Sequence, residues 1–354
     1  MSNHLTRSII SASGATGAKA DLAVIPNEDS SSITCIDVSD PTNMSVLGSV
    51  GSAAMTKPFQ LKLDITNNKA FVICEDDSVA VIDVSNPSSP SILGALALEH
   101  SMKYCDIDPS RDLVFGSDFK GAGGIRIYDV STPSSPSLTG VLENAAYAGA
   151  WGIANHRSRD ICFSVKDNNV IAFNVSNASS PSQSGSTLVD STNLAAAKAI
   201  KLDEDNNVAF IAKYNGMATV DISNTSSMSV LDMVQTPVNN SDNRDIAIDL
   251  DAGIAFVTSV SQNSLMCFDI SNPSSLSHIS TFVDASNFST PRGVMYDPVA
   301  KVAYCSCWYT NKLVAIDCSN TSSMSFLGSV ATGNAPARGA LNIGPREATN
   351  GEET

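Results

Sequence analysis

Alternating apolar and polar residues run through the chain from Ala20 onward, and one short pattern returns seven times. In the clearest copy, residues 78–96 read SVAVIDVSNPSSPSILGAL: an apolar stretch, an aspartate, a run of Ser, Asn and Pro, and a second apolar stretch. Apolar residues at every second position indicate a strand, whereas Ser, Asn and Pro favour tight turns. Each copy therefore predicts a strand, a polar turn and another strand.

An aspartate or asparagine ends the first strand of every copy. These residues are Asp37, Asp83, Asp129, Asn174, Asp221, Asp269 and Asp317, at intervals of 45 to 48 residues. A carboxylate or amide oxygen in this position bonds the backbone two residues further on, which starts a turn. We therefore interpret this column of residues as turn chemistry and not as a metal or catalytic site.

A second hairpin lies between successive copies. Residues 58–77 (PFQLKLDITNNKAFVICEDD) and residues 290–307 (TPRGVMYDPVAKVAYCSC) show it most clearly. Each repeat then holds four strands in about 46 residues, which is typical of a β-propeller blade. Seven copies predict an all-β, seven-bladed β-propeller with four antiparallel strands per blade, and its stability depends on ring closure.

The first copy lacks an innermost strand, and the C-terminus offers one. Residues 337–343 (ARGALNI) align with the inner-strand residues 291–297 (PRGVMYD). A blade built from both chain ends hides an exposed sheet edge, so we predict that this C-terminal strand closes the first blade. Residues 6–11 are the alternative donor. The propeller is expected over residues 20–344, between an N-terminal tail (1–19) and an acidic C-terminal tail (345–354).

The repeated core, hydrophobic residues followed by Asp-Val-Ser-Asn-Pro-Ser-Ser-Pro, resembles the LVIVD repeat and covers nearly the whole chain. The resemblance implies a propeller-like protein of a kind often carried on cell surfaces, and it brings no catalytic activity with it. Surface members carry secretion or anchoring sequences, but residues 1–19 contain no apolar signal-peptide core. We therefore expect a cytoplasmic protein without membrane insertion, displayed outside the cell only if the sequence has been trimmed.

Composition narrows the possible partners and chemistry. The net charge of −15 argues against nucleic acid and anionic membranes. Eight cysteines lie mostly inside apolar strand segments without CxxC spacing, so we expect buried free thiols. The motifs GxSxG, GxxxxGK[ST] and HExxH do not occur, and the four histidines occupy unrelated repeat positions. The sequence predicts no catalytic residues, no metal and no cofactor.

One column of the repeat is unusually basic. Five residues before the end of each inner strand stand Phe59, Lys103, Trp151, Lys198, Arg244, Arg292 and Arg338. Five of these seven are basic, although Lys and Arg make up only 21 of 354 residues. They begin the strands that would line the central channel. Like charges in one narrow mouth repel one another, so such a ring needs compensating negative charge.

Two sources of that negative charge are open. Loops between the second and third strands open on the same face and carry Glu28, Asp29, Glu75, Asp76, Asp77, Asp118 and Asp167. Alternatively, an anionic ligand binds at the channel mouth, where tryptophans add aromatic faces suited to a sugar or a carboxylated molecule. The predicted ligand-binding residues are Lys103, Trp151, Lys198, Arg244, Arg292, Trp308 and Arg338.

We predict a non-catalytic scaffold that binds a partner protein, a glycan or a small anion through the channel-mouth face, because a rigid disc with variable loops suits that role. The alternative is an enzyme resembling the seven-bladed sugar-lactone hydrolases, whose anionic substrates would suit a basic mouth. No histidine falls in the inner-strand start column, which argues against that enzyme. Cations at the mouth also disfavour a metal-dependent lactonase.

Overall fold

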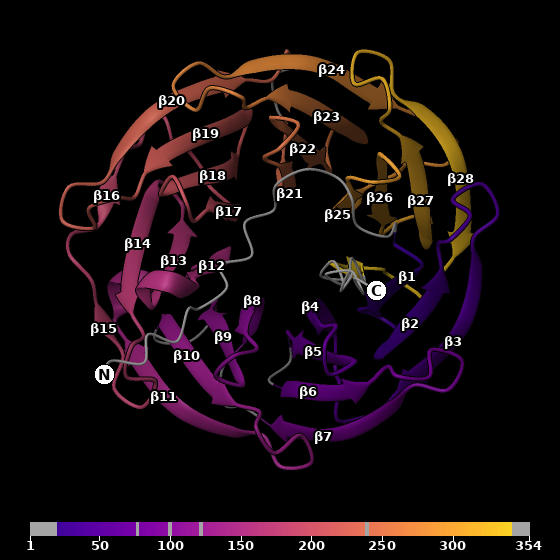
Figure 1. Cartoon of the computed structure of the whole chain (residues 1–354), viewed down its shortest axis with the longest axis horizontal. Helices are drawn as coiled ribbons and strands as arrows, with labels where there is room; N and C mark the ends of the chain where they lie inside the picture. Colours follow the sequence, from indigo (N-terminus) through magenta and orange to yellow (C-terminus); the bar gives the residue numbers. More distant parts are fainter. Residues whose placement is uncertain (1–19, 76–77, 98–100, 120–122, 238–240, 342–354) are drawn as a thin grey trace, which may run out of the picture.

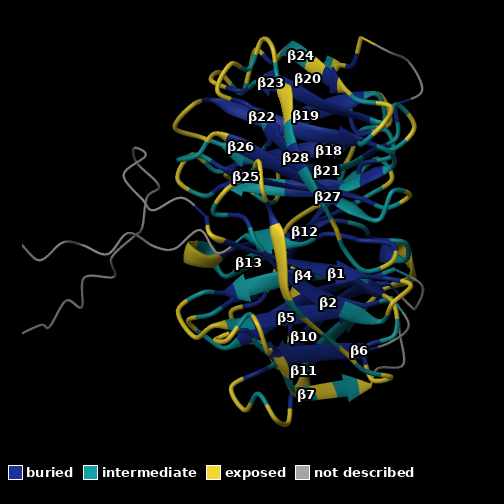
Figure 2. Ribbon diagram, turned by 90° about the vertical axis from the view of Figure 1, so that its right-hand side faces the viewer, coloured by how far each residue is buried: buried dark blue, intermediate teal, exposed yellow. Residues whose placement is uncertain are grey.

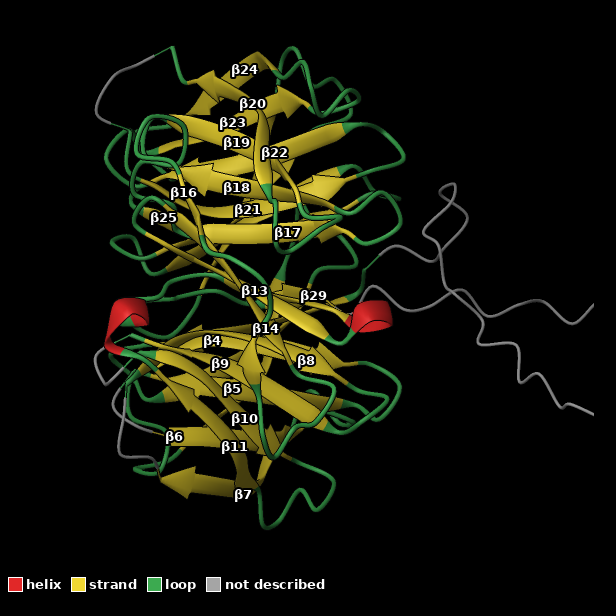
Figure 3. Ribbon diagram, turned by 90° about the vertical axis from the view of Figure 1, so that its left-hand side faces the viewer, coloured by secondary structure: helices red, strands yellow, loops and turns green. Residues whose placement is uncertain are grey.

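Seven antiparallel sheets stand radially around a central channel in the computed structural model, which describes residues 20–75, 78–97, 101–119, 123–237 and 241–341 (Figure 1). The prediction of a seven-bladed β-propeller is confirmed. Apart from the strands, the described chain contains two single 3-10 turns, Ala145–Tyr147 and Arg157–Arg159 (Figure 3). Over these same ranges, no helix has the length and hydrophobicity needed to cross a bilayer.

The strands follow one another from the innermost to the outermost in each blade. Blade one contains β29 (Ala340–Leu341), β1 (Leu22–Asn27), β2 (Ser32–Asp37) and β3 (Ser45–Gly51). Blade two contains β4 (Pro58–Asp64), β5 (Lys69–Cys74), β6 (Ser78–Asp83) and β7 (Ser91–Ala97). Blade three contains β8 (Met102–Asp108), β9 (Leu113–Asp118), β10 (Gly124–Asp129) and β11 (Ser137–Glu143).

The remaining blades repeat this plan. Blade four contains β12 (Ile153–His156), β13 (Ile161–Lys166), β14 (Asn169–Asn174), β15 (Ser182–Gln183) and β16 (Leu188–Val189). Blade five contains β17 (Ala199–Asp203), β18 (Val208–Lys213), β19 (Gly216–Asp221) and β20 (Ser229–Gln235). Blade six contains β21 (Asn243–Asp249), β22 (Ile254–Ser259), β23 (Ser264–Asp269) and β24 (Ser277–Val283). Blade seven contains β25 (Pro291–Asp297), β26 (Val302–Cys307), β27 (Lys312–Asp317) and β28 (Ser325–Ala331).

Blade four departs from the plan at its outer edge, where two short strands, β15 and β16, pair separately with β14. The segment between them reads SGST and lacks the apolar alternation of the other outer strands. Gly185 has a φ of 67°, a left-handed conformation that interrupts a strand. The local sequence therefore explains the broken outer strand.

Apolar side chains fill the joints between blades. Figure 2 shows burial concentrated in the strands of the interior, with exposed residues along the rim and the loops. Seven hydrophobic clusters correspond to the seven pairs of adjacent blades, including blade seven with blade one. All eight cysteines are buried free thiols, as predicted. Burial raises the pKa of the Cys35 and Cys267 thiols to about 12, so neither is a ready nucleophile.

The repeated Asp column forms turns in all seven blades. Each side chain accepts a hydrogen bond from the backbone N–H of the serine two residues further on, at 2.8 to 3.0 Å. In blade two, this bond joins the Asp83 carboxylate to the Ser85 N–H at 2.8 Å. The turn interpretation of the column is therefore confirmed.

The turn that follows each aspartate also packs against the outer strand of the preceding blade, a feature we call the perimeter contact. It requires a residue without a side chain at five positions along the outer edge, because a Cβ there would lie within 3 Å of the next turn's backbone. These positions are Gly48, Gly94, Gly140, Gly185 and Gly328. Blades five and six use polar contacts instead: Asp232 accepts the Leu276 N–H at 2.6 Å, and Ser280 donates to the Thr321 carbonyl at 2.5 Å.

Asp83→Ala is expected to lower the free energy of unfolding by about 0.5–2 kcal/mol, by analogy with lost side-chain caps. The substitution removes the acceptor of the Ser85 N–H and loosens a turn that packs on Gly48. Asp83→Asn is the matched control, since Asn174 makes the same bond in blade four. Urea unfolding would measure both variants, and equal loss in the two would contradict the turn interpretation.

The C-terminal strand closes the ring as predicted. Strand β29 pairs antiparallel with β1 through Ala23–Leu341 and Val24–Ala340. The preceding residues add further backbone contacts: the Ala337 N–H donates to the Pro26 carbonyl at 2.8 Å, and a bridge joins Gln60 to Arg338. The alternative donor, residues 6–11, lies outside the described residues, as do both tails and residues 342 and 343 of the aligned segment.

Candidate functional site

The seven residues of the predicted column gather at one end of the channel, which we call the channel mouth. Four of them occupy β-bulges: the register of the inner strand shifts at Phe59, Lys103, Arg244 and Arg292. A bulge inserts one extra residue and re-aims its side chain. Neighbouring blades are also joined here by backbone bonds, such as the Arg338 N–H to the Phe59 carbonyl at 3.1 Å. The structure therefore brings together side chains far apart in sequence.

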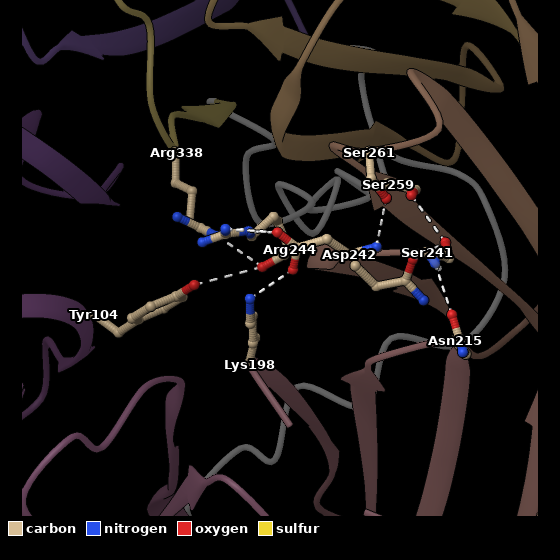
Figure 4. A network of polar contacts seen from close by, with 10 residues as sticks. Tyr104, Lys198, Asn215, Ser241, Asp242, Arg244, Ser259, Ser261 and Arg338 are labelled. Atoms are coloured by element: carbon tan, nitrogen blue, oxygen red, sulfur yellow. Dashed lines mark hydrogen bonds and ion pairs between the residues drawn. The ribbon is translucent and has the colours of Figure 1, made fainter. Parts of the chain in front are cut away.

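A shared carboxylate holds two of the cations (Figure 4). Asp242 Oδ1 lies 2.5 Å from Lys198 Nζ, and its Oδ2 lies 2.6 Å from Arg244 Nη2. The loop that carries Asp242 is fixed on both sides, because the Asp242 N–H donates to Ser261 Oγ at 2.8 Å and the Ser241 N–H donates to Asn215 Oδ1 at 2.6 Å. Asp242 thus neutralises part of the charge of two basic residues.

Arg338 reaches across the channel from the closing segment. Its Nη2 donates to the Arg244 carbonyl of blade six at 2.7 Å, and its guanidinium lies 4.5 Å from the ring centroid of Tyr104 and 5.1 Å from that of Phe59 (Figure 4). Its nearest carboxylate oxygen, on Asp245, is 3.8 Å from Nε. Arg338 is only 1% exposed. Its Nε and Nη1 have no hydrogen-bond partner among the described residues.

Acidic loops balance the other basic residues. Arg292 Nη1 lies 2.6 Å from Glu28 Oε2, and Lys103 Nζ lies 3.3 Å from Glu75 Oε1. Burial raises the pKa of Glu28, and the nearby Glu75 and Asp29 add to that effect against the opposing charge of Arg292. Glu28 and Glu75 also lie within hydrogen-bonding reach of each other, so the network continues from blade seven to blade three.

The other acidic residues that we considered have different surroundings. Asp118 binds Arg126 of its own blade at 3.2 Å. Asp167 makes no ion pair with a residue in the described ranges, and Asp76 and Asp77 fall outside them. The compensation of the basic ring therefore comes from Glu28, Glu75 and Asp242.

Aromatic rings occupy the opposite side of the channel mouth. Trp151 packs edge to face on Phe119 at 5.0 Å and on Tyr104 at 6.0 Å, and Tyr104 packs on Phe59 at 6.0 Å. Three cations lie near the Trp151 ring, 4.9 to 5.4 Å from its centroid: Lys103, Lys198 and Arg244. Trp308 stands apart from this group, 4.4 Å below the Arg292 guanidinium.

The channel mouth is consequently polarised. Blades two to four contribute the aromatic group of Phe59, Tyr104, Phe119 and Trp151, together with Lys103. Blades five, six, seven and one contribute Lys198, Arg244, Arg292 and Arg338. Burial lowers the pKa of Lys198 and of Arg292, and the positive charges of Arg244 and Arg338 lower both further. An anion placed on this side would relieve that repulsion.

The sequence analysis did not identify two residues of the channel mouth, Asp242 and Tyr104. Asp242 lies in the loop that leads into the inner strand of blade six, and only its position two residues before Arg244 hinted at pairing. Tyr104 directly follows a member of the basic column and turns toward the channel because the bulge at Lys103 re-aims the strand. Neither contact could be read from the spacing of the repeat.

Comparison with protein families identifies the repeat. A family model described as the LVIVD repeat matches residues 29–51, 63–97, 120–143, 197–236, 254–284 and 303–332. These segments take in more than half of the chain, and they include the repeated turn in six of the seven blades. A comparison with curated proteins finds no match.

Many solved structures share the fold. A protein from Lactobacillus plantarum superposes with a TM-score of 0.75 at 16% identity, over 92% of this chain and 99% of its own. A putative 6-phosphogluconolactonase from Bacteroides fragilis gives 0.77 at 9% identity, over 93% and 99%. A periplasmic gluconolactonase from Pseudomonas aeruginosa gives 0.76 at 12% identity, over 92% and 99%. At these identities, the likeness establishes the fold alone.

Proposed function

Because the chain belongs to the LVIVD repeat family and folds as a seven-bladed β-propeller, we propose that it is a non-catalytic binding scaffold. The binding surface is the channel mouth. Its ligand carries an anionic group beside an apolar or ring-shaped face, as an acidic glycan, a small carboxylated molecule or an acidic segment of a partner protein does. The observation that carries this proposal is the polarised mouth, where three basic residues lie against the aromatic group and a fourth lies over Trp308.

The small number of carboxylates available to the basic residues of the channel mouth supports binding of an anion there. Lys198 and Arg244 share a single carboxylate, and the Asp245 carboxylate near Arg338 already accepts the Val294 N–H at 3.0 Å. The accessible cations are Arg244 and Arg292, whose side chains are 26% and 25% exposed. Arginine's planar fork suits a carboxylate, sulfate or phosphate group. The aromatic faces opposite suit the C–H face of a sugar ring.

Arg292→Ala is expected to weaken binding of an anionic ligand about tenfold, or roughly 1.4 kcal/mol. The substitution removes a partly exposed cation above Trp308, and on this proposal the fold stays intact. Galacturonate and inorganic sulfate are suitable probes, titrated by calorimetry against the wild type and the variant. Arg157→Ala is the matched control, since Arg157 is an exposed arginine beyond the opposite end of an inner strand.

The alternative outcome is equally specific. If the ring only ties blades together, Arg292→Ala leaves the buried Glu28 carboxylate without its cation, and the melting temperature falls. No binding of either probe by the wild type, together with that melting loss, would overturn the scaffold proposal. Turnover of a sugar lactone by the wild type would contradict its non-catalytic character.

A further inference from the structure

The carboxylate of Asp242 occupies a position that two cations of the channel mouth define. Its Oδ1 lies 2.5 Å from Lys198 Nζ (Figure 4). Its Oδ2 accepts from Arg244 Nε at 2.9 Å and from Arg244 Nη2 at 2.6 Å. Both oxygens therefore meet a charged donor, which is the pattern of a strong pair with a carboxylate. We call this position between Lys198 and Arg244 the carboxylate subsite.

The backbone that carries Asp242 is fixed on both sides. Its N–H donates to Ser261 Oγ at 2.8 Å, and its carbonyl accepts the Val260 N–H at 3.0 Å. The neighbours Ser241 and Asn243 are fully buried, and the Ser241 hydroxyl donates to Asn243 Oδ1 at 2.7 Å. Because these contacts hold the loop by its backbone and its neighbours, the Asp242 carboxylate can leave the subsite by rotation of its own side chain.

Among the three acidic residues that balance the basic ring, Asp242 is the most exposed. Its side chain is 25% exposed, compared with 15% for Glu75 and 11% for Glu28. A carboxylate that turns away from its cations needs water in their place, since an unpaired buried charge is costly. Displacement of Asp242 therefore costs less free energy than displacement of Glu28 or Glu75.

Positive charge remains at the carboxylate subsite after Asp242 is counted. Lys198 and Arg244 bring two positive charges against the single negative charge of Asp242. Arg338 adds a third cation close by, since its Nη2 donates to the Arg244 carbonyl at 2.7 Å while its nearest carboxylate oxygen is 3.8 Å away. An anion from solution is therefore attracted to this side of the channel mouth while Asp242 is still in place.

We propose that the carboxylate subsite receives a carboxylate group of the ligand, and that Asp242 competes for the same position. The inference rests on the proposed function: it names the anionic group of the ligand and the residue that regulates its affinity. The subsite fits a carboxylate because it already holds one, with donors to two oxygens. Ligand binding exchanges one carboxylate for another, and the Asp242 side chain turns toward solvent.

Calorimetric titration of galacturonate into Asp242→Ala tests the competition. We expect the full-length variant to bind about tenfold tighter than the wild type, as it does if Asp242 fills the subsite roughly nine-tenths of the time. Asp205→Ala is the matched control: it removes the same charge from an exposed turn beyond the far end of β17, and it should leave the affinity unchanged. Asp242→Asn keeps the size of the side chain without its charge, should also bind tighter, and serves if the alanine variant fails to fold.

Formate tests the carboxylate subsite without any sugar. Asp242→Ala leaves Lys198 and Arg244 without their shared carboxylate, so its melting temperature should fall below that of the wild type. Formate supplies a free carboxylate for the vacated position and should raise the melting temperature of the variant more than sodium chloride of the same ionic strength does. The wild type, in which Asp242 fills the position, should show no such difference between the two salts.

Two results would overturn the inference. The first is binding of galacturonate by Asp242→Ala that is no tighter than binding by the wild type, because Asp242 would then only orient Lys198 and Arg244. The second is stabilisation of the variant by formate that does not exceed the effect of chloride. The titration of the wild type tests the scaffold proposal by itself, so a failure of that proposal is distinguishable from a failure of the competition.

Discussion

Removal of residues 336–354 is expected to abolish cooperative unfolding and to cause aggregation. The shortened chain loses β29 and with it the pairing of Ala23 and Val24 of β1, so the innermost edge of blade one is exposed. It also loses the backbone bond between Leu61 N–H and the Arg338 carbonyl, which ties blade one to blade two. Propeller blades are stabilised through neighbours and by closure, so one open joint weakens the whole ring.

Thermal unfolding followed by circular dichroism, with light scattering in parallel, measures this effect. Deletion of residues 1–10 is the control and should cost little, because β1 receives its partner from the C-terminal segment. A chain ending at residue 335 that melts like the full-length protein would contradict the closure model.

Arg338→Met is expected to lower the free energy of unfolding by about 2–3 kcal/mol. Methionine keeps much of the apolar contact with Phe59 and Tyr104 but loses the bond to the Arg244 carbonyl and both cation–π contacts. It also leaves the Asp245 carboxylate without its nearest cation. The loss should be large for a single side chain because Arg338 contacts three other blades.

Arg338→Lys separates charge from shape. Lysine keeps the positive charge but not the planar fork that donates to the Arg244 carbonyl while lying against two rings, so an intermediate loss is expected. Urea midpoints for the two variants and the wild type provide the comparison. If Arg338→Met were as stable as the wild type, the guanidinium would be an uncompensated buried charge and not a brace across the channel.

The fold could be predicted from the sequence because the strands and the turn of each repeat are determined by residues within that repeat. An aspartate such as Asp83 bonds the N–H two residues on, and strand alternation on both sides does not depend on distant residues. Blade closure was also predictable, since the segment at Arg338 copies the inner strand at Arg292. Seven nearly equal units leave few ways to assemble a closed ring.

The channel mouth was only partly predictable. The basic column was visible, and Glu28 and Glu75 were among its proposed partners. The sharing of Asp242 and the crossing of Arg338 depend on bulges and on distances across the ring, which repeat spacing does not encode. The close contact that requires glycine in the outer strands could not be predicted either, because the turn that approaches Gly48 belongs to the next repeat.

The perimeter contact has a consequence for copy number. Its two halves, a polar turn and a small or polar outer-strand residue, are present in each repeat, so a gene that gained or lost one copy would still encode matching joints at the rim. The centre is different, because Arg338 reaches Tyr104 and Arg244 only at one ring diameter. Duplication of one repeat would therefore preserve the contacts between blades at the rim. In the channel, by contrast, every change of blade number would require different side chains to span the new diameter.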